Sequence, residues 1–220
     1  MFLESMQIAV HHRVSPDELT SNKKEVLRYL GYSKKDLMEN EIIDFSTDRL
    51  VDSCMAEMKS VLKCQGVYSI FDLNVEGKKI SFADISFESE SLSINLKSCT
   101  KIVLLAATIG PAADFLIKKA TKLDTAKAAV MNSCGAMFIE EYVNLLNDKI
   151  SKDAFSQGFK SKPRFSPGYG DVPLSIQKEF FRLLPCTQRL GLTLMESLIM
   201  APEKSVTAFV GLEPALYKQR

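Results

Sequence analysis

Apolar positions along the chain switch between helical spacing and the alternation or continuous runs that are typical of strands. Residues 15–17, Ser-Pro-Asp, open a predicted helix that ends near Gly31, because Ser caps helices, Pro suits the first turn and Gly suits the position after the end. Ser33 and Asp36 form a capping-box-like pair before a predicted short helix. A longer helix is predicted after Ser46, where apolar residues recur at near-helical spacing: Leu50, Cys54, Met58 and Val61.

The next segment has the pattern of a β-hairpin. Gln65 and Gly66 break the preceding helical pattern. Residues 67–75 and 79–82 then predict two strands that are joined at Glu76-Gly77.

The middle of the chain predicts one buried strand between helices. Residues 91–98 predict a short helix, and the continuous apolar run at 102–107 predicts a fully buried strand. Pro111 starts another helix. Asp124 opens the longest one, which runs to about Lys152 and carries these residues on its inner side: Ala128, Met131, Cys134, Phe138, Val143 and Leu146.

The last third begins with a long irregular segment, residues 156–173, which is rich in Gly and Pro. Long ordered loops in compact domains are disproportionately functional. A helix follows and stops at Pro185, with three residues on one face: Ile176, Phe180 and Leu183. Residues 190–200 predict a strand and residues 202–204 a turn. Residues 205–212 predict a second strand with these residues on one side: Val206, Ala208, Val210 and Leu212.

This mixed order of helices and strands predicts an α+β fold. We expect a single domain, residues 1–220, with helices packed on a twisted, largely antiparallel sheet. Residues 1–100 form its helical and hairpin part, and residues 101–220 carry the candidate ligand site.

Composition narrows the class of protein. The 220 residues suffice for one sizeable core, and the 46% hydrophobic and 25% charged fractions are ordinary for a globular protein. A net charge of +1 gives no basic excess for nucleic acid. No apolar run approaches the roughly 20 residues that span a bilayer, and residues 1–10 lack the features of a signal peptide. These features predict a cytoplasmic protein without a membrane segment.

Cysteines and histidines offer little chemistry. The five cysteines are scattered and form no CxxC pair, so buried free thiols are expected rather than disulfides or a zinc site: Cys54, Cys64, Cys99, Cys134 and Cys186. The only histidines, His11 and His12, are adjacent and have no third ligand nearby in the sequence. A strand or loop pair is the simpler interpretation, and no metal site is predicted.

The candidate chemistry lies in residues 164–169, Arg-Phe-Ser-Pro-Gly-Tyr. The planar guanidinium of Arg164 can hold a carboxylate with two hydrogen bonds, and Gly168 and Gly170 allow close approach of a ligand to the backbone. Tyr169 offers an apolar face with a polar tip. The same residues also suit a plain surface turn, because Pro-Gly is a common type II turn pair.

Blocks of sequence that follow one another in the same order resemble the activation domain of cobalamin-dependent methionine synthase. Residues 164–178, RFSPGYGDVPLSIQK, are similar to that family's Arg-x-x-x-Gly-Tyr signature. Residues 192–206, LTLMESLIMAPEKSV, are similar to its next block, with Glu196-Ser197, Met200, Pro202 and Ser205-Val206 in the same order. Residues 135–150 are similar to its long helix, and residues 106–114 to the strand-to-helix turn of its free-standing members.

This resemblance implies a site for S-adenosylmethionine. Arg164 would hold the methionyl carboxylate, and the backbone around Ser166 would pair with the adenine edge. Gly168 and Tyr169 would shape the floor, and Glu140 would take the ammonium group or favour the sulfonium. Sequence alone leaves open whether Glu140 or its neighbour Glu141 is the buried one, and Glu196 is expected to be structural.

The chain also departs from the family pattern. An additional acidic ligand near the start of the domain has no clear counterpart, with Asp72 and Asp84 as candidates that no motif supports. The loop before Arg164 is shorter than in the large enzymes. Tyr217 lies only approximately where the family places a tyrosine near the adenosine.

The function implied by the resemblance is reductive methylation, which returns oxidised cob(II)alamin to use. A flavodoxin- or ferredoxin-like donor would supply the electron, and a separate corrinoid protein, most simply a split methionine synthase, would carry the cobalamin. The chain alone would show no turnover. Three alternatives stay open: service to another corrinoid methyltransferase, a small-molecule methyltransferase, which would usually show a Gly-rich loop in a doubly wound sheet, and an assembly module without ligand binding.

Overall fold

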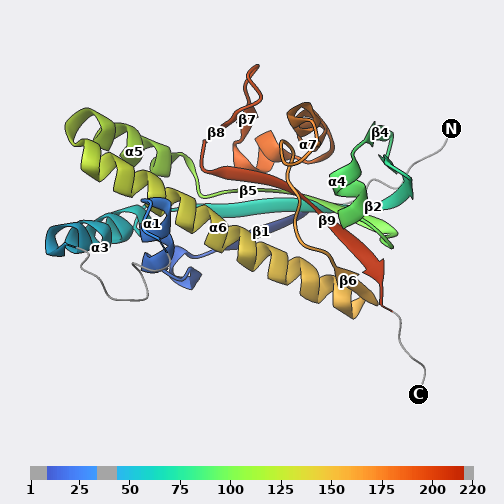
Figure 1. Cartoon of the computed structure of the whole chain (residues 1–220), viewed down its shortest axis with the longest axis horizontal. Coiled ribbons are helices and arrows are strands. Elements are labelled where there is room, and N and C mark those ends of the chain that lie inside the picture. The colour runs from blue at the N-terminus through green and yellow to red at the C-terminus, as the bar shows by residue number, and fades with distance from the viewer. Residues whose placement is uncertain (1–8, 34–43, 216–220) are drawn as a thin grey trace.

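The computed structural model describes residues 9–33 and 44–215, and its centre is one antiparallel sheet of seven strands (Figure 1). The strand order is β4-β3-β2-β5-β9-β6, and β1 pairs with the first half of β2. The strands are β1 (Val10–Val14), β2 (Cys64–Glu76), β3 (Lys79–Phe82), β4 (Ile85–Glu88), β5 (Lys101–Thr108), β6 (Phe159–Ser161) and β9 (Ser205–Pro214). A separate two-stranded hairpin consists of β7 (Thr193–Leu194) and β8 (Met200–Ala201). The predicted α+β class with an antiparallel sheet is confirmed.

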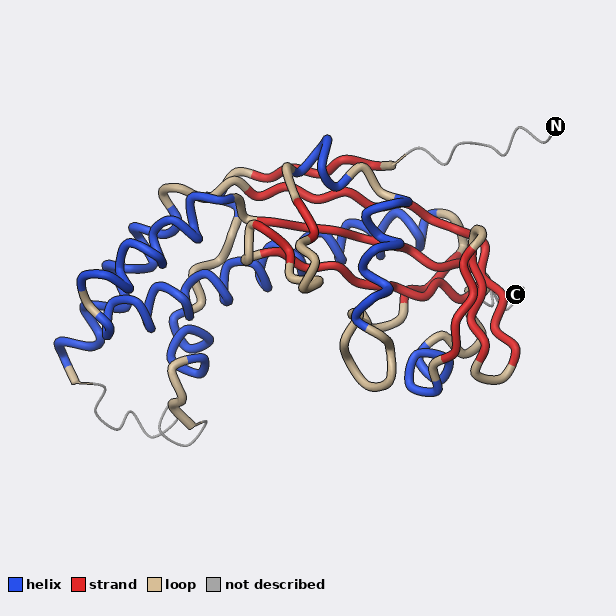
Figure 2. Tube along the Cα trace, turned by 90° about the horizontal axis from the view of Figure 1, so that it is seen from above, coloured by secondary structure: helices blue, strands red, loops and turns tan. Residues whose placement is uncertain are grey.

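Helices cover the sheet in two groups. The long helix α6 runs along the sheet, and α1, α3 and α5 gather at one end of it, whereas α4 and α7 lie toward the other end (Figures 1 and 2). The bounds are α1 (Lys23–Tyr29), α3 (Phe45–Lys59), α4 (Glu90–Asn95), α5 (Pro111–Leu123), α6 (Thr125–Ser156) and α7 (Gln177–Leu183). None of the helices in the described ranges has the length and apolarity that a membrane crossing requires.

Strand β5 separates two hydrophobic cores. Its residues alternate, with Val103 and Leu105 facing α6 and its neighbours, and Ile102 and Leu104 facing α4 and α7. All four are fully buried, as the continuous apolar run predicts. The neighbouring β9 alternates in the same way, and the side predicted for it is confirmed: Val206, Ala208, Val210 and Leu212 contact the core under α6.

The first predicted helix is divided in two, which corrects the continuous helix expected up to Gly31. Ser15 caps only a single 3₁₀ turn, Pro16–Glu18, after which Leu19 is extended. Asn22 then accepts a hydrogen bond from the Glu25 amide and starts α1 anew. The helical pattern is thus interrupted between Leu19 and Asn22. The Asn22 side chain caps the start of a new helix, so the chain does not continue the turn that Ser15 begins. The short helix predicted after Ser33 lies outside the described residues.

Gly66 does not interrupt the structure, contrary to the sequence prediction. It lies inside β2, directly beneath the long helix. A Cβ atom there would come within 2.8 Å of the Leu146 Cδ2 atom and 3.1 Å of the Tyr142 hydroxyl. The glycine therefore allows α6 to approach the sheet, and β2 begins earlier than predicted.

The strand predicted for residues 190–200 is wrong. A single turn of π-helix, Cys186–Leu190, and the short β7–β8 hairpin occupy this segment. The apolar residues of the hairpin do not pack in the core: Met195 is 43% exposed and Ile199 53% exposed. Leu198 takes a left-handed conformation (φ 65°) that turns the chain. Glu196 lies exposed in the same turn.

The predicted free thiols are confirmed. All five cysteines are buried and unpaired. Burial raises the pKa of Cys64, Cys134 and Cys186 to about 12 and that of Cys99 to about 11, and it raises the pKa of Cys54 as well. Of the two placements left open for His11 and His12, a strand or a loop, the structure shows the strand, because both residues lie in β1.

These thiols are expected to be inert in the folded protein. Because the thiolate is the reactive form and burial raises each thiol pKa, no cysteine should react with an aromatic disulfide reagent at about pH 8. Five thiols per chain should react once concentrated guanidinium chloride is added. A thiol that reacted within seconds in the native protein would contradict this prediction.

Candidate functional site

Arg164 lies at a β-bulge on the edge of the sheet. The chain from β6 onward runs antiparallel to β9, with the Lys162 amide donating to the Gly211 carbonyl at 2.8 Å. The next pairing joins Phe165 to Phe209, with hydrogen bonds of 3.0 and 2.7 Å in the two directions. Two residues, Pro163 and Arg164, thus lie opposite one, Val210. Such bulges redirect side chains and are common beside active sites.

The bulge directs Arg164 toward α6. Its Nη2 atom donates to the Glu140 Oε2 atom at 3.2 Å and to the Asn144 Oδ1 atom at 2.9 Å. The other terminal nitrogen, Nη1, is buried and has no hydrogen-bond partner among the described residues. Arg164 therefore has one donor nitrogen, Nη1, that no described residue uses, while the two hydrogens of Nη2 are already donated to Glu140 and Asn144.

Glu140, rather than its neighbour Glu141, is the glutamate that contacts the guanidinium. Its side chain is 47% exposed, so a carboxylate oxygen remains within reach of a ligand. Its neighbour Glu141 has a different environment, in which burial and the charge of Glu25 raise the pKa of its carboxyl group. Arg164 and Glu140 therefore bring opposite charges to one spot, which suits a ligand that carries both charges.

Residues 166–172 form a compact turn after the bulge (Figure 1). The Tyr169 amide donates to the Ser166 carbonyl at 3.2 Å, and the Gly168 amide donates to the Val172 carbonyl at 3.0 Å. Gly168 has a positive φ of 86°, a conformation that favours glycine. The Tyr169 side chain is 69% exposed and available to a ligand. We name residues 166–172 the ligand loop.

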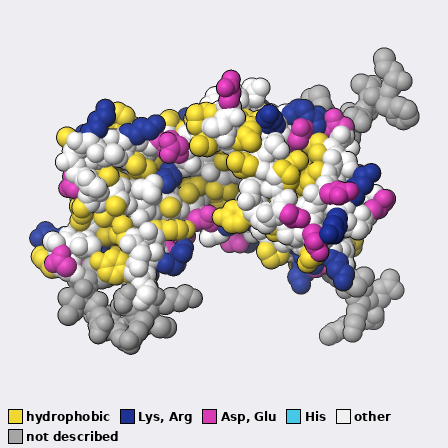
Figure 3. All heavy atoms as spheres, turned by 45° about the horizontal axis from the view of Figure 1, so that its top comes forward, with side chains coloured by type: hydrophobic (Ala, Val, Ile, Leu, Met, Phe, Trp, Pro, Cys, Tyr) yellow, Lys and Arg dark blue, Asp and Glu magenta, His cyan; other side chains and the backbone are white. Residues whose placement is uncertain are grey.

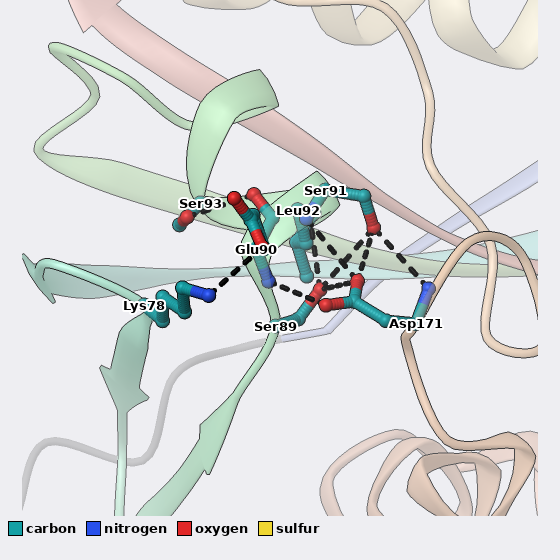
Figure 4. A network of polar contacts seen from close by, with 7 residues as sticks. All are labelled: Lys78, Ser89, Glu90, Ser91, Leu92, Ser93 and Asp171. Carbon is teal, nitrogen blue, oxygen red and sulfur yellow. Dashed lines mark hydrogen bonds and ion pairs between the residues drawn. The ribbon is translucent and has the colours of Figure 1, made fainter.

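Asp171 ties this loop to α4 across 80 residues of sequence (Figure 4). Its carboxylate accepts the Glu90 amide at 2.6 Å and the Ser91 amide at 3.1 Å. It also accepts hydrogen bonds from the Ser89 hydroxyl, at 2.6 Å, and from the Ser91 hydroxyl. The Ser89 and Ser91 hydroxyls hold the pKa of Asp171 well below its usual range, so the carboxylate stays charged at neutral pH.

A second cation touches α6 nearer its N-terminus. The Lys204 Nζ atom donates to the Asn132 Oδ1 atom at 2.8 Å, and the side-chain stem lies over Gly135. Burial lowers the pKa of Lys204. Asn132 and Glu140 are separated by two turns of helix, roughly 12 Å. Arg164 and Lys204 thus contact α6 at two points whose separation is comparable to the length of a small-molecule ligand.

The remaining predicted site residues lie elsewhere. Asp72 pairs with Lys101 at 2.6 Å, and Asp84 pairs with Arg182 at 2.5 Å, so neither is shown beside Arg164. Tyr217 lies outside the described residues. Within the described part of the chain, no three His, Cys, Asp or Glu side chains gather as a metal site.

An open hollow of about 440 Å³ lies between the β3–β4 hairpin and α7, and Asp84 is the one predicted candidate residue that lines it. Its lining is largely polar: Asp84, Ile85, Ser86, Ile176, Glu179 and Arg182. Figure 3 shows that the molecule is also hollowed between its helical end and its opposite end, with hydrophobic side chains in that region.

Asn144, Asp171 and Lys204 were missed by sequence reasoning. Asn144 follows Glu140 by one helical turn, so that spacing could have identified it. The partners of Asp171 and Lys204 are 80 and 72 residues away in sequence, and no local pattern marks them.

Together, the antiparallel sheet, the long helix across it and the Arg-bearing edge loop define an α+β domain with one candidate site for a small zwitterion. The chain matches no protein-family model and no curated protein. Among solved structures it matches the "Crystal Structure of the MetH Reactivation Domain bound to AdoHcy", with a TM-score of 0.70 and 15% sequence identity. The match covers 97% of this chain and 81% of that chain. At this identity the likeness shows the fold, which is the fold that the sequence resemblance predicts.

Proposed function

We propose that this chain binds S-adenosylmethionine at Arg164 and Glu140 and supports reductive methylation of cob(II)alamin on a separate corrinoid protein. The observation that carries the proposal is the guanidinium of Arg164, which is fixed on α6 while its Nη1 atom has no partner. The shared fold with a domain that was crystallised with AdoHcy adds support. AdoHcy has the same aminoacyl end as S-adenosylmethionine.

The residues present fit this ligand. The buried, unpartnered donor of Arg164 suits the ligand carboxylate, and the half-exposed carboxylate of Glu140 suits its ammonium group. The ligand loop, with Ser166, Gly168 and Tyr169, would hold the adenosine part. Tyr169 has an exposed ring available for this, and Gly168 keeps the backbone accessible.

The role of the chain is binding and orientation. When bound, S-adenosylmethionine supplies a sulfonium methyl group as an electrophile. Arg164 and Glu140 fix the two charged groups at one end of the ligand, so the orientation of the whole molecule follows. Holding two reactants in a productive geometry is itself a large catalytic contribution, and it requires no acid, base or nucleophile from this chain.

The same proposal includes a partner protein, an electron donor and a biosynthetic role. The chain acts as a single domain, residues 1–220, in trans on a cobalamin protein such as a split methionine synthase. A flavodoxin- or ferredoxin-like protein provides the electron. The chain alone shows no turnover, and the reaction belongs to methionine biosynthesis in the cytoplasm.

Calorimetric titration with S-adenosylmethionine tests the proposal directly. We expect saturable binding of one ligand per chain, with S-adenosylhomocysteine competing for the same site. Absence of binding at millimolar ligand, both alone and with a cobalamin-loaded corrinoid protein present, would refute it. Binding only in the presence of the corrinoid protein would show that the partner completes the site.

A further inference from the structure

Asp171 forms a contact between the ligand loop and α4, which lie 80 residues apart in the sequence. Its carboxylate lies at the first turn of α4 and takes four hydrogen bonds there, two from the Glu90 and Ser91 amides and two from the Ser89 and Ser91 hydroxyls (Figure 4). The Asp171 amide in turn donates to the Ser91 hydroxyl oxygen at 3.4 Å. We call this set of contacts the Asp171 clasp.

Helix α4 has a cap of its own. Ser89 is the N-cap residue, and its hydroxyl oxygen accepts the Leu92 amide at 3.1 Å. Lys78 additionally pairs with Glu90 at 2.8 Å. The clasp therefore adds a long-range contact to a helix start that is already capped, and the segment that gains most from it is the one that contributes Asp171.

The ligand loop depends on this contact for its position. Between Phe165, which is bonded to β9, and Val172, which is buried, the hydrogen bonds that join one backbone group to another stay within the loop itself. Those bonds do not attach the loop to the rest of the molecule. Gly170 sits against the Ser91 side chain so closely that an added Cβ atom would overlap the Ser91 hydroxyl. The loop and α4 are thus fitted to each other at the clasp.

We infer that Asp171 is a positioning residue: it holds the ligand loop in its binding conformation from outside the site. This inference rests on the proposed function for its ligand. Asp171 touches α4 through its carboxylate, two residues beyond Tyr169, and it reaches the ligand only through the loop. A ligand that binds a loop already in place does not bear the cost of ordering it.

Asp171→Asn is the decisive variant, because the amide keeps the size of the side chain but replaces one acceptor oxygen with a donor. We expect the dissociation constant for S-adenosylmethionine to rise about tenfold, as the loop spends most of its time out of place. Asp171→Glu retains the carboxylate and should recover part of this loss. Asp48→Asn is the matched control: it removes one charge from an aspartate paired with Lys23, and it should leave the affinity unchanged.

Hydrogen exchange without any ligand gives an independent readout. In Asp171→Asn, the amides of Gly168, Tyr169 and Val172 should exchange faster, while those of β5 and β9 keep their wild-type rates. A general loss of folding would accelerate both sets and shift the melting temperature, so a uniform change would overturn the inference in favour of a merely structural role.

The two proposals fail in different ways. If the wild type binds ligand and Asp171→Asn binds it equally well, the positioning role is wrong and the proposed function stands. If the wild type binds no ligand, the proposed function fails, and exchange in the loop decides the remaining claim: unchanged rates in Asp171→Asn would overturn it, and faster rates confined to the loop would support the clasp as the element that orders it.

Discussion

Replacing Arg164 by alanine is expected to weaken S-adenosylmethionine binding by about 100-fold or more. A hydrogen bond to a charged group contributes about 1.5–3 kcal/mol, and the ligand carboxylate would lose at least the one donated by the Nη1 atom. Each 1.4 kcal/mol is about a factor of ten in affinity. The loss of Arg164 also leaves Glu140 without its basic partner, which adds repulsion toward the ligand carboxylate. Calorimetric titration of wild type and variant measures the difference.

Two further variants sharpen this test. Arg164→Lys keeps the charge but not the planar pair of donors, so we expect an intermediate affinity. Arg182→Ala is a matched control, because Arg182 is also held by two side chains, Asp84 and Glu179, but away from the ligand loop. Wild-type affinity in Arg164→Ala would show that the ligand carboxylate binds elsewhere.

Phe209→Ala is expected to cost about 3–5 kcal/mol of folding free energy, the usual range for removing a buried phenylalanine ring. The ring is fully buried and packs against Phe180 at 4.8 Å, Phe82 at 5.9 Å and Phe87 at 6.3 Å between ring centroids. Whole domains are stable by only about 5–15 kcal/mol, so the variant should be close to unfolding at ambient temperature.

Urea unfolding followed by circular dichroism measures this loss. Phe155→Ala is the control: its ring is 63% exposed near the end of α6, and the change should stay within about 0.5 kcal/mol. A loss below about 1 kcal/mol for Phe209→Ala would mean that the core beneath α4 and α7 repacks around the cavity.

Sequence patterns predict this fold correctly where the local sequence itself determines the element and its burial. The apolar run at 102–107 is a strand buried on both faces, and Pro111 and Asp124 start helices because their own side chains define the first turn. The pattern fails within residues 190–200, where Met195 and Ile199 belong to an exposed hairpin rather than to a core strand. It also fails at Gly66, since the reason for that glycine is a helix 80 residues later.

The candidate site likewise contains some residues that the sequence predicts and other features that it does not. Arg164, Gly168 and Tyr169 are predicted from one short motif, and Glu140 from a resemblance in the long helix. No local sequence pattern predicts the bulge or the Asp171 clasp, because each forms only when segments that are distant in the sequence come together.

The bulge at Pro163 and Arg164 shifts the register of this strand against β9 by one residue. Strand side chains alternate between faces, so one inserted residue reverses the side to which every later residue points. In an uninterrupted pairing, position 164 rather than 165 would oppose Phe209 and point into the core beneath α4 and α7. The extra residue instead gives that place to Phe165 and turns the guanidinium toward α6. A chain shorter by one residue here would keep every group of the motif and still be unable to form the site.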